Sequence, residues 1–147
     1  MAINEILRDK GCDVQTISPQ ATVFAAIERM VSHGIGALAV VDDGRLVGML
    51  TERDYLRRVA LEGRTSRTTL VREIMTPRVV TVRPSDGIDE SLEVMTAQRL
   101  RHLPVIEQGE LVGIVSMGDL VKRKVADKEL EITQLVEYIQ TSGCPPV

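Results

Sequence analysis

Apolar and polar positions along the chain follow a pattern that predicts a small mixed unit. An extended segment is expected over 14–17, and an apolar stripe at three- and four-residue spacing then predicts an amphipathic helix. The stripe consists of Val23, Ala26, Ile27 and Met30. Two short apolar runs, 37–41 and 46–50, flank the polar tetrapeptide 42–45, which is typical of a hairpin turn. A second helix over 52–61 completes a β-α-β-β-α unit.

The same unit returns 65 positions later. Residues 14–60 align with residues 79–125 without a gap. Chance similarity between two amphipathic stretches would match apolar positions, but it would not keep glycines and an aspartate in register. Those matches are Gly44 with Gly109, Gly48 with Gly113, and Asp54 with Asp119. The chain is therefore two copies of one unit, and we expect its function to lie between them.

The second copy repeats the predicted elements. It has an extended segment over 79–82, a helix over 88–98, strands over 102–106 and 111–115, and a helix from Met117. Thr22 is the expected N-cap of the first helix, and Gly34 suits the left-handed residue just past its end.

The repeats divide the chain into segments. Each copy starts with a similar short lead-in helix, so the first copy is expected over 1–62 and the second over 70–126. The polar stretch 63–69 reads as the linker. The remainder, 127–147, is an amphipathic tail helix followed by a frayed end.

The tail carries an apolar stripe that needs a surface to cover it. The stripe contains Leu130, Ile132, Leu135, Val136 and Ile139. Because an isolated helix of this length is marginal in water, we expect it to dock on the module or on another subunit, with docking beside a dimer interface favoured. The helix is expected to continue from the one that starts near Met117, and it is either a static clasp or a ligand-responsive element.

Composition narrows the class of protein. With 147 residues, 44% apolar and 27% charged, the chain matches a globular protein with one shared core. A net charge of −3 gives no basic field to recruit nucleic acid or an acidic membrane. No apolar run approaches the roughly 20 residues of a membrane span, and the N-terminus has no apolar signal region, so the expected location is the cytoplasm.

Cysteine usage and catalytic motifs give no sign of an enzyme. Cys12 and Cys144 belong to no metal-binding or dithiol motif, so two free thiols are expected, with a regulatory disulfide as the alternative. The chain shows no nucleophile–base set, no metal-ligand cluster and no phosphate-binding loop motif. We therefore expect neither catalysis nor a bound metal.

The sharpest chemical feature follows the last strand of each copy. Thr51 with Asp54, and Ser116 with Asp119, place a hydroxyl and a carboxylate on the first turn of a helix, beside unpaired backbone N–H groups. Such a turn can hold a phosphate oxygen and can accept hydrogen bonds from two neighbouring hydroxyls, as on a ribose. Taken alone, each pair also fits simple helix capping, and duplication does not separate the two interpretations.

Taken together, these motifs resemble the CBS domain pair, or Bateman module. The resemblance rests on Pro19 and Pro84 after the extended segments, on 102–105 before the second hairpin, on the repeated Leu-Val-Gly, and on the two hydroxyl–aspartate turns. It covers residues from about 3 to 125. It implies an α/β (α+β) fold in which tandem β-α-β-β-α repeats pack as a pseudo-twofold pair. Two clefts between the repeats would bind adenosine-containing ligands such as AMP, ADP, ATP or NAD.

The resemblance also implies roles for particular residues. Asp54 and Asp119 would take ribose hydroxyls, and Thr51 and Ser116 would take phosphate or ribose oxygens. The adenine would be framed by backbone at Ile17, Val82, Gly36, Ala37 and Pro104. Phosphates would meet Arg101 and His102 in one cleft and Arg53 in the other.

The two clefts are not equivalent by sequence. Gly36 and Ala37 in the first copy correspond to Arg101 and His102 in the second, and Arg53 corresponds to Gly118. The turn at Ser116 and Asp119 is therefore expected to lack a cation of its own. Either the clefts hold different ligands, or one is occupied weakly.

The favoured function is a regulatory module that senses an adenosine ligand, forms a homodimer and changes its contacts with a partner protein that the sequence does not identify. The alternative is a protein-interaction scaffold with vestigial clefts.

Overall fold

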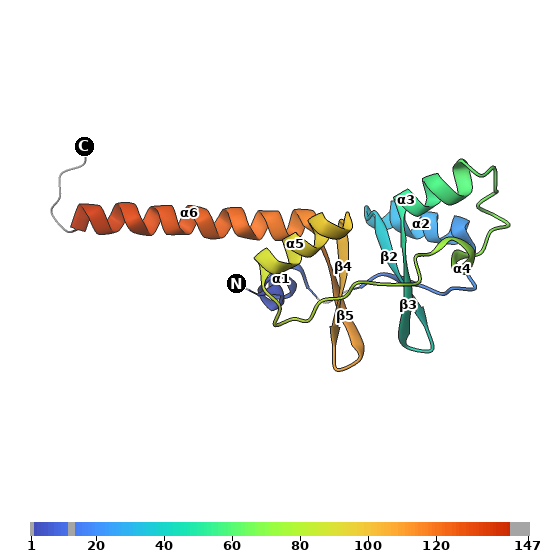
Figure 1. Cartoon of the computed structure of the whole chain (residues 1–147), viewed down its shortest axis with the longest axis horizontal. Coiled ribbons are helices and arrows are strands. Elements are labelled where there is room, and N and C mark those ends of the chain that lie inside the picture. Colours follow the sequence, from blue (N-terminus) through green and yellow to red (C-terminus); the bar gives the residue numbers. More distant parts are fainter. Residues whose placement is uncertain (1, 12–13, 142–147) are drawn as a thin grey trace.

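The computed structural model describes residues 2–11 and 14–141. Cys12, Cys144 and the expected frayed end lie outside the described residues. The chain has an α+β fold built from two tandem units, and their sheets stand side by side in Figure 1.

The first unit follows its predicted order. It comprises β1 (Thr16–Ile17), α2 (Val23–His33), β2 (Ala37–Asp42), β3 (Arg45–Thr51) and α3 (Glu52–Tyr55), which continues into a π-helical turn, η1 (Leu56–Ala60). β2 lies in the middle of the sheet, parallel to β1 and antiparallel to β3. The predicted caps of α2 are confirmed: the Thr22 side chain accepts a hydrogen bond from Ala25 N, and Gly34 is left-handed at φ 61°.

The second unit has the same helices and hairpin but a shorter sheet. It contains α5 (Ile88–Gln98), β4 (His102–Glu107), β5 (Glu110–Ser116) and α6 (Met117–Thr141). The extended segment expected over 79–82 makes a single parallel bridge, between Val82 and Val105. Pro104 occupies the position that Ala39 holds in the first unit, and a proline has no N–H to contribute to a ladder, which accounts for the reduced pairing.

The two lead-in helices are exchanged between the units. α1 (Ile3–Lys10) precedes the first unit, but its buried residues Ile3, Ile6 and Leu7 belong to the core of the second. Conversely, α4 (Val71–Ile74) precedes the second unit and buries Val71 and Ile74 in the core of the first. Each core is therefore completed by a segment from the other side of the linker, and the units fold as one body.

Equivalent glycines permit this exchange. A Cβ at Gly48 would lie 2.7 Å from Met75 Sδ and 2.9 Å from the Thr76 carbonyl oxygen. A Cβ at Gly113, 65 positions later, would lie 2.5 Å from Leu7 Cδ2. All three distances are shorter than real Cβ contacts, so the repeated Leu-Val-Gly lets each lead-in segment cross its strand closely.

The units also pack directly against each other. Ala37, Ala39 and Met49 of the first sheet are buried in a cluster that includes Leu111 and Ile114 of β5. The cluster lies between the two hairpins and joins the sheets. The ends of β2 and β4 are thereby held close together, and this arrangement positions the candidate site.

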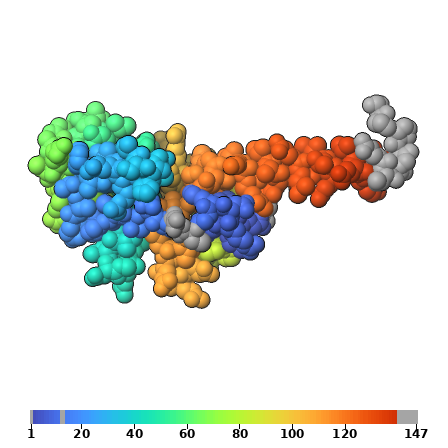
Figure 2. All heavy atoms as spheres, turned by 180° about the vertical axis from the view of Figure 1, so that it is seen from behind, coloured from blue at the N-terminus to red at the C-terminus, as the bar shows by residue number. Residues whose placement is uncertain are grey.

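α6 extends far beyond the body. Its first turns pack beside α1 and α5, and the remainder projects as a single helix (Figures 1 and 2). Ile132 and Leu135 are each 61% exposed. The sequence left two docking surfaces open for the tail: the module itself and another subunit. In the described residues, the projecting part of α6 does not dock on the module.

Candidate functional site

The two hairpins bring several predicted site residues of both copies close together. Ala37 pairs with Thr51, and His102 pairs with Ser116, at the same ends of their sheets. A Cβ built on Gly36 would lie 3.8 Å from His102 Cε1, so the starts of β2 and β4 are neighbours. The strand register therefore gathers side chains that are far apart in the sequence.

A cavity of about 240 Å³ lies at this junction, and we call it the second cleft. Its lining residues come from both units and from α1. They are Lys10, Gly11, Gln15, Gly34, Ile35, Gly36, Ala37, His102, Gly113, Ile114 and Ser116. Four predicted site residues are among them: Gly36, Ala37, His102 and Ser116.

Ser116 and Asp119 form a reciprocal cap at the start of α6. Asp119 N donates to Ser116 Oγ at 3.1 Å, and Ser116 N donates to Asp119 Oδ2 at 2.9 Å. These two hydrogen bonds are those of a helix cap. In this structure the motif therefore acts as a cap. The same cap also fixes the carboxylate at the edge of the second cleft, where Ser116 is a lining residue.

Lys10 supplies the cation that this helix start was expected to lack. Its Nζ lies 2.8 Å from Asp119 Oδ2 and donates to the Ile114 carbonyl oxygen at 2.9 Å. The expectation was wrong because Lys10 reaches the second copy only through the exchange of the lead-in helices. The sequence offered one signal, a basic residue at the end of an amphipathic lead-in helix, but nothing in it assigned that helix to the other copy.

The electrostatics of the second cleft favour a charged aspartate and a neutral histidine. Burial by itself raises the pKa of Asp119, but hydrogen bonds from Lys10 and from Ser116, with the charge of Lys10, hold that pKa below its usual range. Burial lowers the pKa of His102, and the positive charge of Lys10 lowers it further. The nearby carboxylates of Asp119 and Glu52 partly oppose this. The cleft thus presents an ammonium, a carboxylate and an imidazole together.

The other helix start, at Thr51 and Asp54, is capped in the same way but has a different partner. Asp54 N donates to Thr51 Oγ1 at 3.3 Å, and Thr51 N donates to Asp54 Oδ2 at 2.9 Å. Thr76, from the segment after α4, donates to Asp54 Oδ1 at 3.2 Å. A hydroxyl therefore meets Asp54 where an ammonium meets Asp119, so the two helix starts have different partners.

The remaining predicted residues are divided between the cores and the surface. Ile17 and Val82 are buried in the cores, and Val82 N already donates to the Pro104 carbonyl oxygen at 3.0 Å. Arg53 and Arg101 are exposed on the surface. The Arg101 carbonyl oxygen accepts from Met117 N at 2.8 Å, which places Arg101 next to the start of α6.

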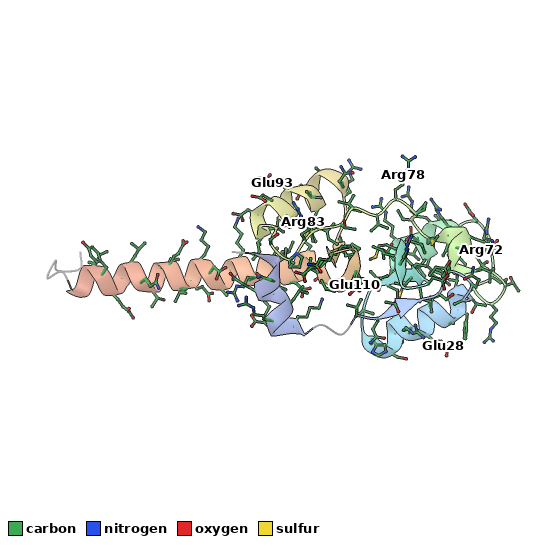
Figure 3. All side chains as sticks on the ribbon, turned by 90° about the horizontal axis from the view of Figure 1, so that it is seen from below. Glu28, Arg72, Arg78, Arg83, Glu93 and Glu110 are labelled. Carbon is green, nitrogen blue, oxygen red and sulfur yellow. The ribbon has the colours of Figure 1, made fainter. Side chains whose placement is uncertain are left out.

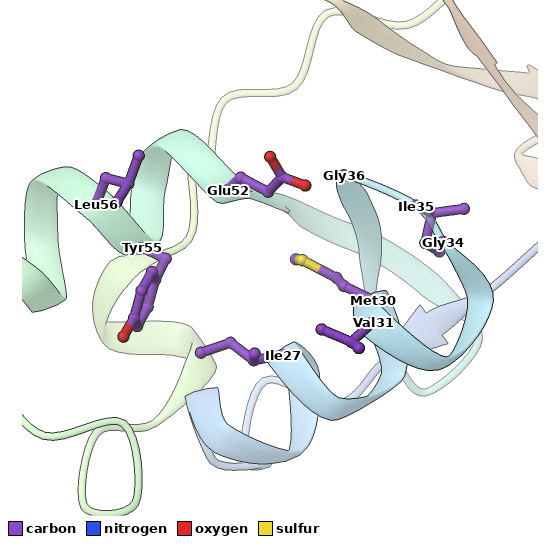
Figure 4. Close-up of a pocket in the computed structure, with 9 residues that line it drawn as sticks. All are labelled: Ile27, Met30, Val31, Gly34, Ile35, Gly36, Glu52, Tyr55 and Leu56. Atoms are coloured by element: carbon purple, nitrogen blue, oxygen red, sulfur yellow. The ribbon is translucent and has the colours of Figure 1, made fainter.

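A larger cavity of about 420 Å³ lies between α2 and α3 of the first unit (Figure 4). Apolar side chains form most of its wall, including Ile27, Met30 and Val31 from α2. Glu52 is the charged side chain in its lining. A wall with a carboxylate and no lysine, arginine or histidine repels phosphate, so size does not make this cavity the better nucleotide site.

Within residues 2–11 and 14–141, no group of three or more His, Cys, Asp or Glu side chains is placed to hold a metal ion. None of the helices in the described part of the chain is both long and apolar enough to cross a membrane.

Comparison with known proteins gives one consistent result. The CBS domain family model matches twice, at residues 3–61 and 71–126. A protein of Arabidopsis thaliana named CBS domain-containing protein CBSX3, mitochondrial, is 37% identical over 94% of this chain and 71% of its own length. The structure of a putative signal-transduction protein with CBS domains from Burkholderia ambifaria superposes with a TM-score of 0.83 at 45% identity, covering 86% of this chain and 96% of that one.

A third match carries ligands. It is the CBS domain pair of protein MJ0100 in complex with 5′-methylthioadenosine and S-adenosyl-L-methionine. It superposes with a TM-score of 0.75 at 25% identity, covering 87% of this chain and 98% of that one.

Proposed function

The chain belongs to the CBS domain family, and we propose that it is a regulatory module whose second cleft binds a phosphate-bearing adenosine ligand. The observation that carries this proposal is the meeting of Lys10, His102 and Ser116 around one cavity, with the Asp119 carboxylate 2.8 Å from Lys10 Nζ. Asp119 is suited to accept from ribose hydroxyls, and Lys10 and His102 are suited to a phosphate. The ligands of the MJ0100 domain pair support an adenosine core.

The second cleft is smaller than most ligand sites, so a bound nucleotide would have to enlarge it. Sites for small molecules enclose about 300–1,000 Å³, and this cavity holds about 240 Å³. Lys10 lines the cleft, and its ammonium forms an ion pair with Asp119. A ligand phosphate would compete for that ammonium and draw it off the carboxylate, which would both enlarge the cleft and release Asp119 for the ribose. AMP, ADP, ATP and NAD all carry the two groups that this requires.

The regulatory consequence would pass through α1. Its residues Glu5 and Asp9 bind Arg123 of α6 at 2.8 and 3.1 Å, and its last residue is Lys10. A shift of Lys10 would therefore reach the projecting helix through ion pairs that already exist. We propose that this helix, in a homodimer, presents the ligand state to a regulated protein.

A thermal-shift panel tests the proposal. AMP, ADP, ATP, NAD, S-adenosylmethionine and adenosine would each be added to the full chain, and mass spectrometry would identify what co-purifies. A ligand at 100 times its dissociation constant stabilises the fold by about 2.7 kcal/mol, which is readily measured. If none of them raised the melting temperature, the ligand-sensing function would be ruled out and the protein-interaction scaffold favoured. In such a scaffold Lys10 would remain paired with Asp119 and occupy the cleft permanently.

Calorimetry on single variants locates the site. Asp119→Ala and the exposed Arg101→Ala should each weaken the same binding event, because both residues lie at the start of α6. Asp54→Ala, which removes the corresponding carboxylate of the first copy, is the matched control and should spare it. Equal losses in all three variants would contradict the assignment to the second cleft.

A further inference from the structure

Six positions on α6, five of them apolar, follow a repeat of alternating four and three residues. They form a stripe that we call the seam, and it consists of Val121, Val125, Lys128, Ile132, Leu135 and Ile139. This spacing averages 3.5 residues and defines a coiled-coil heptad, with Val125, Ile132 and Ile139 at a, and Val121, Lys128 and Leu135 at d. One polar residue, Lys128, interrupts it.

The seam is exposed and turned away from the body. Val121 and Val125 are 46% and 51% exposed, although they lie close to the module. Leu120, Arg123 and Asp127 form the side of α6 that packs on the body, more than a quarter-turn around the helix from the seam. Figure 3 shows side chains extending from the projecting part of α6 on both sides of the ribbon, without another described element beside them. A partner helix can therefore reach the seam without displacing the body.

We propose that α6 pairs with α6 of a second copy of this chain, along the seam, as a short parallel two-stranded coiled coil. β-branched residues at a with leucine at d are the combination that favours two parallel strands. Val125 and Ile132 provide the first and Leu135 the second.

Charge complementarity and geometry support the parallel arrangement. In a parallel pair, a g residue faces the e residue five positions later on the other helix. Lys124 at g, which within its own chain pairs with Asp89 at 2.6 Å, would then also face Glu129 of the second copy at e, and the twofold axis repeats this contact. Because the body lies more than a quarter-turn from the seam, an axis parallel to the helix places the two bodies on opposite sides of the pair.

The pairing should be weak and reversible. Lys128 at d brings a charge into the seam, which lowers affinity, and its ion pair with Glu131 of the same helix, at 3.3 Å, only partly offsets that charge. A helix of this length is marginal when it stands alone in water, so pairing also stabilises residues 128–141.

Sedimentation of two glutamate variants tests the proposal by comparing a charge placed in the seam with a charge placed on the opposite face of α6. Ile132→Glu places a charge at an a position, whereas Leu130→Glu changes a residue of similar exposure, 56% against 61%, on the far side of the helix. Both side chains are exposed, so neither change should disturb the fold, and circular dichroism checks this. We expect Ile132→Glu to raise the dimer dissociation constant by about tenfold or more and Leu130→Glu to leave it unchanged. Equal effects, or a wild-type chain that stays monomeric throughout, would overturn the proposal.

Cross-linking reports the seam contact directly, whatever other interfaces exist. In a Cys12→Ser/Cys144→Ser background, Leu135→Cys should form a disulfide-linked dimer under mild oxidation, because d residues of parallel helices lie side by side. Leu130→Cys in the same background should not. Failure of Leu135→Cys to cross-link above the level of Leu130→Cys would refute the parallel pair.

Discussion

Replacing Lys10 with methionine should remove the preference of the second cleft for a phosphorylated ligand. The change keeps the length of the side chain and deletes the ammonium that lies 2.8 Å from Asp119 Oδ2. In the wild-type chain a ligand phosphate would accept from Lys10, while a ligand without phosphate would leave Lys10 on Asp119 to compete with the ribose. AMP and adenosine, which share the nucleoside, therefore form the diagnostic pair.

The magnitude follows from the geometry of the pair. A hydrogen bond to a charged group contributes about 1.5–3 kcal/mol, which corresponds to at least about tenfold in affinity. Lys10 is 43% exposed and must leave Asp119 to reach a phosphate, so the low end of this range applies. We expect Lys10→Met to weaken AMP by about tenfold and to leave adenosine unchanged or tighter. Adenosine gains because Asp119 no longer has an internal competitor.

Isothermal titration calorimetry at low and high salt measures this effect. The wild-type affinity for AMP should fall with salt, because the contact is ionic and partly exposed, and that of the variant should fall less. Lys124→Met is the matched control: Lys124 also pairs with an aspartate, Asp89, at 2.6 Å and is 40% exposed, but it lies outside the cleft. Equal losses for AMP and adenosine, or no loss for AMP, would refute the role of Lys10. A wild-type chain that binds neither would refute the proposed function itself.

Three further outcomes are expected. Gly48→Ala should lower the melting temperature by several degrees, since overpacking against Met75 costs about 1–3 kcal/mol, whereas a Cβ at Gly118 meets nothing closer than 3.6 Å and Gly118→Ala should be tolerated in the same melting assay. Because folding lowers the pKa of His102, protonation of His102 favours the unfolded chain. The free energy of unfolding, measured with a chemical denaturant, should therefore contain a contribution from His102 that is complete above pH 6.5 and declines below it. His102→Gln should reduce this dependence of the unfolding free energy on pH. Ile3→Ala should cost about 2–5 kcal/mol and, by hydrogen exchange, loosen α5 and β4 more than α2 and β2; the opposite order would contradict the exchange of the lead-in helices.

The sequence by itself determined the elements, because their signals are local. Thr22 caps α2 and Gly34 ends it through interactions within a few residues, and both follow from side-chain chemistry. α5 spans the predicted 88–98, because its apolar stripe repeats that of α2. The 65-residue repeat also indicated one body with a shared interface, because a unit of about 60 residues buries too little surface alone. The resemblance carried by the two hydroxyl–aspartate turns added the family, and the family match bears this out.

Only the tertiary structure decided which segments complete which core. Lys10 and Asp119 are separated by 109 positions, and no local pattern links them. Val71 is apolar and precedes the second unit, yet it is buried in the core of the first. The sequence of an amphipathic helix shows that the helix needs an apolar surface to pack on. It does not show which surface, because the hydrophobic effect is not directional. That choice depends on the shape of the two sheets once they are packed. It decided which cation meets Asp119 and which face of α6 stays exposed.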